Sequence, residues 1–241
     1  MKIVEIQNPP SVEALVDRFG RQRYCFVLDS AQSNDGLGEW SFFGAEPFET
    51  VTGDLADLRQ AMRPYQLEVH PEIPFTGGAV GYLSYDYGRR LENLDSLAKD
   101  DRQIPDMHFG LYDGVAALNH ETGVLFLLGH DFSDTADAVI ERLRAIVGVG
   151  LDTPSDILEQ AATVVTKQAI MISDPPVRRS EWKWNLSRAD FCTAVQRVRD
   201  YIASGDVYQV NLSQRARCIY EGDSVALYQA LRLGNPAPYG A

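Results

Sequence analysis

A row of hydrogen-bonding side chains lies in the last fifth of the sequence. Gln209, Asn211 and Ser213 occupy every second position, and the positions between them are apolar. Alternation with a period of two predicts a strand over 208–218 that buries one face and exposes the polar one. Such a polar face either lines a substrate cavity or meets water, and the spacing alone leaves both interpretations open.

Three glycines, Gly77, Gly78 and Gly81, raise the question of a phosphate-binding loop. Their spacing does not match a dinucleotide-binding fingerprint, and no Lys-Ser or Lys-Thr pair follows them. A glycine inside a strand lets a neighbouring backbone approach closely. We therefore interpret these glycines as positions of close strand packing.

Acidic and sulfur-bearing side chains form no recognisable metal or nucleophile motif. Asp95, Asp100 and Asp101 fall in the polar stretch 92–106, which is typical of a solvated loop rather than a metal site. The three cysteines are widely spaced and odd in number, which fits neither a disulfide framework nor a zinc site. None of them lies in the glycine-rich turn of a glutaminase nucleophile.

Apolar residues at regular spacing predict the elements that must position polar groups. Spacings of three and four predict helices over 12–19, 55–62, 136–147 and 187–203. Strand-like apolar runs lie at 24–28, 40–44, 75–87, 115–118 and 124–128. The last helix should pack through Phe191, Val195, Val198 and Ile202. Since hairpins outnumber strand–helix–strand alternations, we expect an α+β fold of stacked, mainly antiparallel β-sheets with helices on the outside.

The charge balance argues against two classes of partner. The sequence has 34 acidic and 22 basic side chains, a formal net charge of −12. That field repels a nucleic-acid backbone and an anionic membrane surface, so we expect neither as a partner. No apolar run approaches the roughly 20 residues that span a bilayer, and the N-terminus has no signal-peptide pattern. Together with the unpaired cysteines, this favours a cytoplasmic protein.

Four segments in order resemble component I of the anthranilate and aminodeoxychorismate synthases, a family of enzymes that use chorismate. They are 27–47, with the run Val-Leu-Asp-Ser-Ala and then Ser-Phe-Phe-Gly; 74–90, with Gly-Gly-Ala-Val-Gly-Tyr; 104–113; and 204–239, with Gly-Asp-Val-Tyr-Gln-Val-Asn-Leu and then Asn-Pro-Ala-Pro-Tyr. The resemblance covers almost the whole chain but only about the first half of the family's usual length. It implies an N-terminal lobe over 1–150, a linker over 151–186 and the start of the chorismate-binding domain over 187–241.

Within the family, the sequence resembles the aminodeoxychorismate branch. Asn211-Leu212 after Gln209-Val210 is similar to that branch, and so is the run from Gly81 to Glu92. Anthranilate synthase, which serves tryptophan biosynthesis, is the alternative. A stand-alone amino-acid-binding module without catalysis is a further alternative from another class of function.

The resemblance implies a reaction and its participants. Chorismate is aminated, on the way to 4-aminobenzoate and folate, with ammonia from a separate glutamine amidotransferase subunit and with Mg²⁺ at the substrate. In this family a lysine in a Pro-Ile-Lys-Gly segment attacks the ring, and acidic residues further along hold the magnesium. This sequence contains no Pro-Ile-Lys-Gly segment. We therefore assign no catalytic residue and no magnesium ligand to it, and we expect the chain alone to be inactive.

The resemblance also implies an amino-acid pocket of the kind that binds tryptophan. Ser30 would supply a hydroxyl, the segment 37–40 a facing wall, and the segment 238–240 the closure. The implied ligand-binding residues are Ser30, Leu37, Gly38, Glu39, Trp40, Pro238, Tyr239 and Gly240. Without the resemblance, the better explanation is that Ser30 caps a turn and that Trp40 is a core residue.

Overall fold

The computed structural model describes residues 1–31, 38–67, 69–92, 100–149 and 178–240. Two compact units divide the chain: Met1–Lys167 together with Ser224–Ala241, and Gln168–Asp223. The C-terminal segment thus belongs to the first unit. Most of the predicted linker lies outside the described residues, so the predicted domain boundaries stay predictions.

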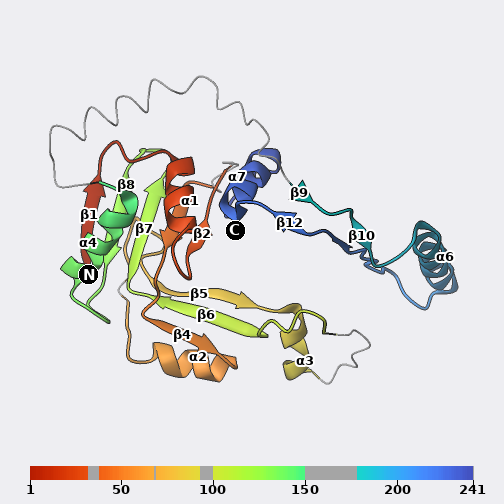
Figure 1. Cartoon of the computed structure of the whole chain (residues 1–241). Helices are drawn as coiled ribbons and strands as arrows, with labels where there is room; N and C mark the ends of the chain where they lie inside the picture. Colours follow the sequence, from red (N-terminus) through yellow and green to blue (C-terminus); the bar gives the residue numbers. More distant parts are fainter. Residues whose placement is uncertain (32–37, 68, 93–99, 150–177, 241) are drawn as a thin grey trace. The chain divides into compact units, whose positions relative to one another are not determined.

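Two antiparallel sheets build the first unit (Figure 1). The larger sheet has the order β1 (Lys2–Ile6), β8 (Leu125–Gly129), β7 (Gly114–Asn119), β3 (Trp40–Gly44) and β2 (Phe26–Leu28). The smaller sheet has the order β4 (Glu49–Thr52), β6 (Met107–Tyr112) and β5 (Gly78–Leu83). Only Asp113 separates β6 from β7, so the chain passes directly from one sheet into the other.

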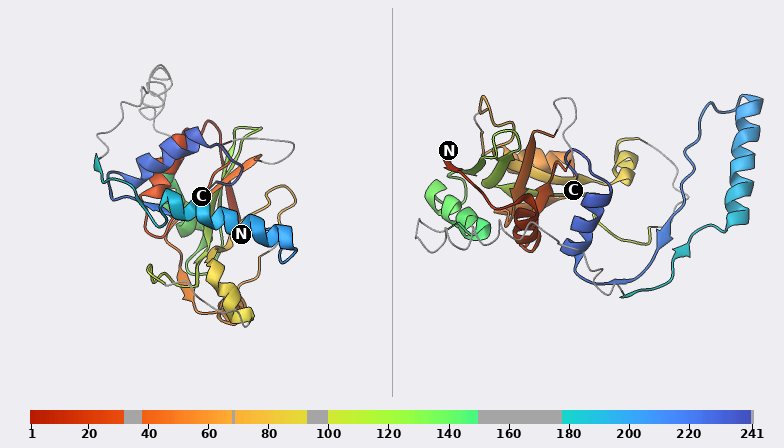
Figure 2. Two further views of the ribbon diagram at one scale, coloured as in Figure 1. Left: turned by 90° about the vertical axis from the view of Figure 1, so that its right-hand side faces the viewer. Right: turned by 90° about the horizontal axis from the view of Figure 1, so that it is seen from above.

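Helices cover one face of the five-stranded sheet. These are α1 (Val12–Gly20) and α4 (Ala136–Val147), whose first turns are capped by the side chains of Ser11 and Thr135. They bury an apolar cluster that includes Leu15, Phe19 and Phe43 from β3. Helix α7 (Ser224–Gly234) lies beside α1, as both views in Figure 2 show. The sheet therefore packs through one face against helices from both ends of the chain.

The other face of the same sheet packs against the smaller sheet. Phe26, Trp40 and Phe42 form a second cluster with Tyr112 and Val115. Helix α2 (Leu55–Met62), the 3₁₀ turn η1 (Tyr85–Tyr87) and α3 (Gly88–Leu91) accompany the smaller sheet. Every residue of β3 and β7 is buried because both faces are covered. The predicted α+β fold with stacked, mainly antiparallel sheets is confirmed.

The locally patterned elements of the first unit match their predictions closely. Strand β3 has the predicted bounds, and β7 pairs with β8 through a hairpin in which Leu118 lies opposite Leu125. Gly123 takes a φ of 70° in the hairpin connection, a conformation that glycine adopts without steric cost. Strand β1 and helix α7 were not predicted.

The second unit differs from the prediction in its strand. Only Ala216–Arg217 (β11) form a strand within 208–218, paired with β10 (Lys183–Trp184). A further short pair joins β12 (Tyr220–Glu221) to β9 (Arg178–Arg179). The predicted strand is therefore wrong over most of its length. An alternating sequence becomes a strand only where a neighbouring strand accepts its backbone hydrogen bonds, and in the described chain that neighbour is two residues long.

The predicted helix of the second unit is confirmed as α6 (Arg188–Ser204), with Ser187 at its N-cap. Its apolar face is not packed: no residue of α6 is buried, and Val195 and Ile202 are 37% and 44% exposed. The packing prediction is wrong for the described part of the chain. None of the described helices is both long enough and apolar enough to cross a membrane.

Gly81 tests the interpretation of close strand packing. A Cβ at this position would lie 2.6 Å from the Cα of Phe109 in β6 and even closer to the carbonyl oxygen of His108. We expect Gly81→Ala to lower the free energy of unfolding by about 1–3 kcal/mol, as overpacking does. Gly88 is the matched control, because a Cβ there meets nothing within 4 Å.

Chemical denaturation of both variants measures the difference. Gly88 begins α3 with a helical φ of −56°, so Gly88→Ala should be neutral or stabilising by up to about 1 kcal/mol. Equal stability of the two variants would show that β5 and β6 do not need a glycine at position 81.

Candidate functional site

Two segments from opposite ends of the chain run side by side in the first unit. The backbone N–H of Asp29 donates to the carbonyl of Gly240 at 2.9 Å, and the N–H of Gly240 donates back at 2.7 Å. The N–H of Ala31 donates to the carbonyl of Ala237 at 3.2 Å. The segment that follows β2 is thus paired with the segment that follows α7, and we call this place the junction.

Ser30 lies at the centre of the junction and is 6% exposed. Its Oγ accepts a hydrogen bond from the N–H of Tyr239 at 3.1 Å, across 209 sequence positions. Its own N–H donates to the Oγ of Ser41 in β3 at 2.8 Å. The structure therefore places Ser30 next to Tyr239, two of the residues predicted to share a pocket.

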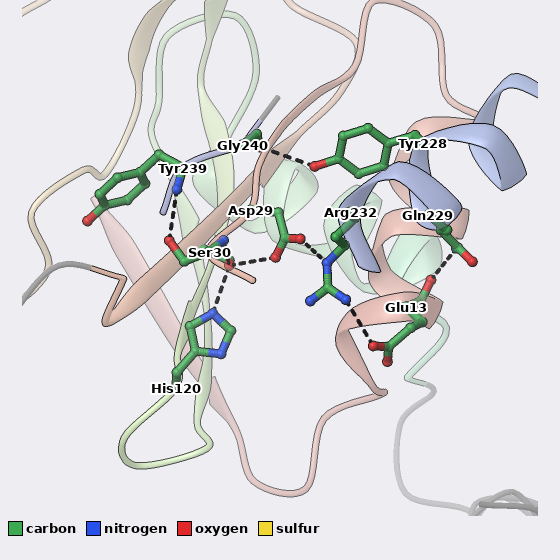
Figure 3. A network of polar contacts seen from close by, with 10 residues as sticks. Glu13, Asp29, Ser30, His120, Tyr228, Gln229, Arg232, Tyr239 and Gly240 are labelled. Carbon is green, nitrogen blue, oxygen red and sulfur yellow. Dashed lines mark hydrogen bonds and ion pairs between the residues drawn. The ribbon is translucent and has the colours of Figure 1, made fainter. Parts of the chain in front are cut away.

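A buried carboxylate lies beside Ser30 (Figure 3). Asp29 is 1% exposed, and its Oδ1 accepts a hydrogen bond from the Oγ of Ser41 at 3.1 Å. Its Oδ2 forms an ion pair with Nε of Arg232 from α7. A second nitrogen of Arg232 contacts the carboxylate of Glu13 in α1 at 3.1 Å. One guanidinium thus joins α1, the end of β2 and α7.

The environment keeps both ends of this network charged. Burial acts against the charged guanidinium, but the hydrogen bond and the charge of Asp29 outweigh it, so the pKa of Arg232 is raised. Burial also acts against the Glu13 carboxylate, yet hydrogen bonds from its own backbone, from Ser11 and from Arg232 leave its pKa lowered. These shifts favour the charged forms of Arg232 and Glu13 near neutral pH.

Helix α7 adds two more polar contacts to the junction. The hydroxyl of Tyr228 donates to the carbonyl of Gly240 at 3.1 Å, and Nε2 of Gln229 donates to the carbonyl of Glu13 at 3.0 Å. These residues were not predicted as site residues from the sequence. The signal was present, because Val225, Tyr228, Gln229 and Arg232 have the spacing of one helix face.

An aromatic row lies beside the junction. Trp40 is 6% exposed, and its ring lies 6.2 Å from that of Phe42, tilted by only 10°. Phe42 stacks in turn with Tyr239 at 6.4 Å and meets the edge of Phe75 at 5.7 Å. The indole of Trp40 also contacts Phe126 at 5.9 Å. Trp40 is thus connected to Tyr239 through Phe42.

The remaining predicted site residues lie around this row in different ways. Gly38 is buried with a φ of 87°, a left-handed conformation that favours glycine. The side chain of Glu39 accepts from Nδ2 of Asn119 at 2.8 Å, so it supports the β7–β8 hairpin. Pro238 is half-buried and precedes Tyr239, and Leu37 lies outside the described residues.

His120, which was not predicted as a site residue, also contacts the network. Nε2 of His120 lies 2.8 Å from the Oγ of Ser41, which contacts Asp29. Burial lowers the pKa of His120, the charge of Asp29 acts to raise it, and Arg232 adds to the lowering; the net direction is down. The neutral imidazole is therefore the form that this environment favours.

The described residues do not offer a metal site. Across the described ranges, no three His, Cys, Asp or Glu side chains are grouped so that they could hold a metal ion. The polar groups of the junction bond to one another, and they link helices α1 and α7 with the end of β2 and with β3. Chemically, this arrangement positions segments of the chain and places polar groups where they could surround a ligand.

Comparison with known proteins identifies the relatives of this fold. The family model described as chorismate binding enzyme matches residues 25–241. The chain belongs to this family. It is 32% identical to aminodeoxychorismate synthase component 1 of Klebsiella aerogenes, over 97% of this chain and 51% of the relative. It is 34% identical to anthranilate synthase component 1 of Thermus thermophilus, over 93% of this chain and 45% of the relative.

A solved structure supports the same fold. Anthranilate synthase component I from Streptococcus pneumoniae matches with a TM-score of 0.60 and 21% identity, over 86% of this chain and 48% of that one. At that identity the likeness concerns the fold alone. The 241-residue chain spans about half the length of the relatives that it matches.

The Asp29–Arg232 pair should dominate the stability of the junction. Arg232→Met removes the charge and leaves a carboxylate that is 1% exposed without its cation. We expect a loss of about 3–5 kcal/mol in the free energy of unfolding, as for other broken buried pairs. Arg21→Met is the control, because the Arg21–Asp17 pair is solvent-exposed and should contribute less than about 1 kcal/mol.

Urea titration of both variants gives the two differences. If Arg232→Met loses no more free energy of unfolding than Arg21→Met, the packing of α7 in the junction does not depend on the buried pair.

His120 should make stability depend on pH. Because its pKa is lowered in the folded state, its contribution is present above about pH 6.5 and is lost as the pH falls from there through the folded pKa. His130, whose pKa burial also lowers, acts in the same direction. His120→Asn should therefore flatten only part of the slope between pH 7 and 5, by at most about 1.4 kcal/mol per pH unit. Unfolding free energies at four pH values test this; an unchanged slope would exclude His120.

Proposed function

We propose that these 241 residues are the N-terminal part of aminodeoxychorismate synthase component I, which aminates chorismate to 4-amino-4-deoxychorismate. The observation that carries the proposal is the alignment with the Klebsiella aerogenes enzyme of that name over 97% of this chain. Component 1 of Bacillus subtilis gives independent support at 29% identity over 91% of the chain. The product would be a precursor of 4-aminobenzoate in a cytoplasmic pathway.

The chemistry of the proposed reaction requires groups that we place outside this chain. Ammonia would come from a glutamine amidotransferase subunit, and Mg²⁺ would bind the substrate carboxylate. The described residues form no cluster that fits a magnesium ion. The family that this chain resembles carries its catalytic lysine in a Pro-Ile-Lys-Gly segment. This sequence contains no such segment. The missing segment is our reason for proposing that catalysis belongs to the other half of the enzyme.

A cavity of about 480 Å³ in the first unit does not suit chorismate. Its walls include Tyr24, Cys25, Val80, Tyr112 and Tyr228, and no Lys, Arg, Asp or Glu side chain lines it among the described residues. Chorismate is a dianion, and a charged ligand enters an apolar cavity only with a compensating partner. We therefore do not place the substrate in this cavity.

Anthranilate synthase component I is the second candidate. The Thermus thermophilus relative of that name is slightly more identical, at 34%, although the alignment covers less of both chains. The geometry of the described fold does not separate the two reactions, and only the resemblance of Asn211-Leu212 and of the run from Gly81 to Glu92 favours the first. A non-catalytic amino-acid-binding module is a third candidate, which the junction alone would support.

We further propose that the junction and the aromatic row form a pocket of the tryptophan-binding type. Its residues would be those that the resemblance implied: Ser30, Leu37, Gly38, Glu39, Trp40, Pro238, Tyr239 and Gly240. Contact between Ser30 and Tyr239, and stacking of Tyr239 on Phe42, support this placement.

The proposal predicts that this chain alone does not turn over chorismate. The assay contains the purified chain, chorismate, an ammonium salt and Mg²⁺; aminodeoxychorismate is followed through its lyase-coupled conversion to 4-aminobenzoate, and anthranilate by fluorescence. We expect product formation at the rate of the enzyme-free control, because catalysis in this family resembles side-chain attack on a metal-bound substrate.

In a second reaction, the C-terminal half of a related component I is added in trans, and product formation is measured in the same way. Formation of 4-aminobenzoate supports the aminodeoxychorismate assignment, whereas anthranilate supports the second candidate. Product from the chain alone would show that residues within 1–241 are catalytic. It would overturn the proposal that catalysis belongs to the other half of the enzyme.

A further inference from the structure

The edge strands of the two sheets differ in charge. In the larger sheet, the edge strand β1 carries Lys2 and Glu5, whereas the opposite edge strand β2 has the sequence Phe-Val-Leu. In the smaller sheet, the edge strand β4 begins with Glu49, whereas the opposite edge strand β5 has the sequence Gly-Ala-Val-Gly-Tyr-Leu. Charged residues and proline keep an exposed strand edge from pairing with another chain. Strands β2 and β5 contain neither.

Both uncharged edges line the cavity of about 480 Å³ in the first unit. Strand β2 contributes all three of its residues, and β5 contributes Val80, Gly81 and Tyr82. The other walls come from the helices α1 and α7 and from β6 of the smaller sheet. The same two layers cover the faces of the larger sheet. The cavity therefore lies where one further strand of the larger sheet would fit, between the helices and the smaller sheet.

The two apolar clusters of the larger sheet extend to this cavity. Val27 packs against the cluster on the helix side, and Leu28 packs against the cluster on the side of the smaller sheet. Both side chains are only half-buried, although every residue of the neighbouring strand β3 is buried. Tyr228 of α7 and Val80 of β5, which also line the cavity, are half-buried as well. A strand with apolar side chains on both faces would complete the burial of these four residues.

The backbone at the end of β2 already pairs on the side away from β3. The N–H and the carbonyl of Asp29 both bond to Gly240. Residues two apart on a strand direct their backbone groups to the same side, so Val27 directs its N–H and carbonyl to this same edge. Within the described ranges, β3 is the only strand that pairs with β2. The antiparallel bridge between Asp29 and Gly240 sets the register in which a ladder along β2 would continue.

We propose that the C-terminal half of component I adds a strand to the open edge of β2, in the antiparallel register that Asp29 and Gly240 begin. The inference rests on the proposed function, because the relatives of that name are about twice as long as this chain. Since no Lys, Arg, Asp or Glu of the described residues lines the cavity, the added strand presents apolar side chains to its walls. One continuous sheet then joins the two halves, and Val27 provides main-chain groups to the contact.

Amide hydrogen exchange in two proteins tests the proposal. One is the 241-residue chain, and the other is a fusion of this chain to the C-terminal half of the Klebsiella aerogenes relative. In the chain alone, the amide of Val27 should exchange at least about tenfold faster than those of Phe26 and Leu28, which face β3. In the fusion it should slow by at least about tenfold. Equal exchange of Val27 in the two proteins would show that no strand is added to β2.

A pair of variants separates main-chain pairing from side-chain burial. Val27→Pro removes the N–H that faces the open edge and leaves the bonds between β2 and β3 in place, as proline does on an edge strand. Val27→Ala is the matched control, because it shortens the same side chain but keeps the N–H. In the 241-residue chain, the two variants should have similar Tm values, whereas in the fusion Val27→Pro should have the lower Tm. The same difference in both proteins would contradict the proposal.

Product assays of the fusion separate this inference from the proposed function. If the fusion forms 4-aminobenzoate while Val27 still exchanges fast, the proposed function stands and the added strand is wrong. Protection of Val27 without any product supports the added strand and contradicts the proposed function. If the fusion does not fold, the C-terminal half of the Thermus thermophilus relative replaces the first one. A 241-residue chain that sediments as a dimer, with a monomeric Val27→Pro variant, would place a second copy on this edge and overturn the proposal.

Discussion

The buried carboxylate of Asp29 is the constraint on which the junction depends. A carboxylate that is 1% exposed is unfavourable unless charged and polar partners surround it, and here those partners are Arg232 and Ser41. Arg232 reaches Asp29 only if α7 lies against α1, where the same guanidinium meets Glu13. This buried ion pair thereby fixes the position of the C-terminal segment on a sheet whose strands all lie within the first 130 residues.

Strand β3 connects this polar network to the aromatic row. Successive side chains of a strand point to opposite faces, so Ser41 and Phe43 face the helices while Trp40 and Phe42 face the smaller sheet. Both faces of β3 are covered, and all five of its residues are buried. A change on one side of this strand is therefore felt on the other, and the junction and the row behave as one packed unit.

Local pattern predicted the elements better than it predicted their partners. The spacing of apolar residues predicted α1, α4, α6 and the β7–β8 hairpin, because each of these is defined by residues close in sequence. The strand predicted over 208–218 failed, since a strand also needs a neighbour that local pattern does not reveal. The contact of Ser30 with Tyr239 was expected only from the family resemblance, and nothing in the local pattern marked Arg232 as the partner of Asp29.

Amide hydrogen exchange of the intact chain tests most directly whether the C-terminal segment is part of the N-terminal fold. The account predicts that the amides of Asp29 and Gly240, which bond to each other's carbonyls, exchange about as slowly as that of Ala116 in β7, because they open only when the packed unit unfolds. Arg232→Met should accelerate them while α6 is unaffected. Exchange at Asp29 and Gly240 as fast as in the irregular stretch 207–215 would contradict the account, since it would show that the junction opens independently of the sheet.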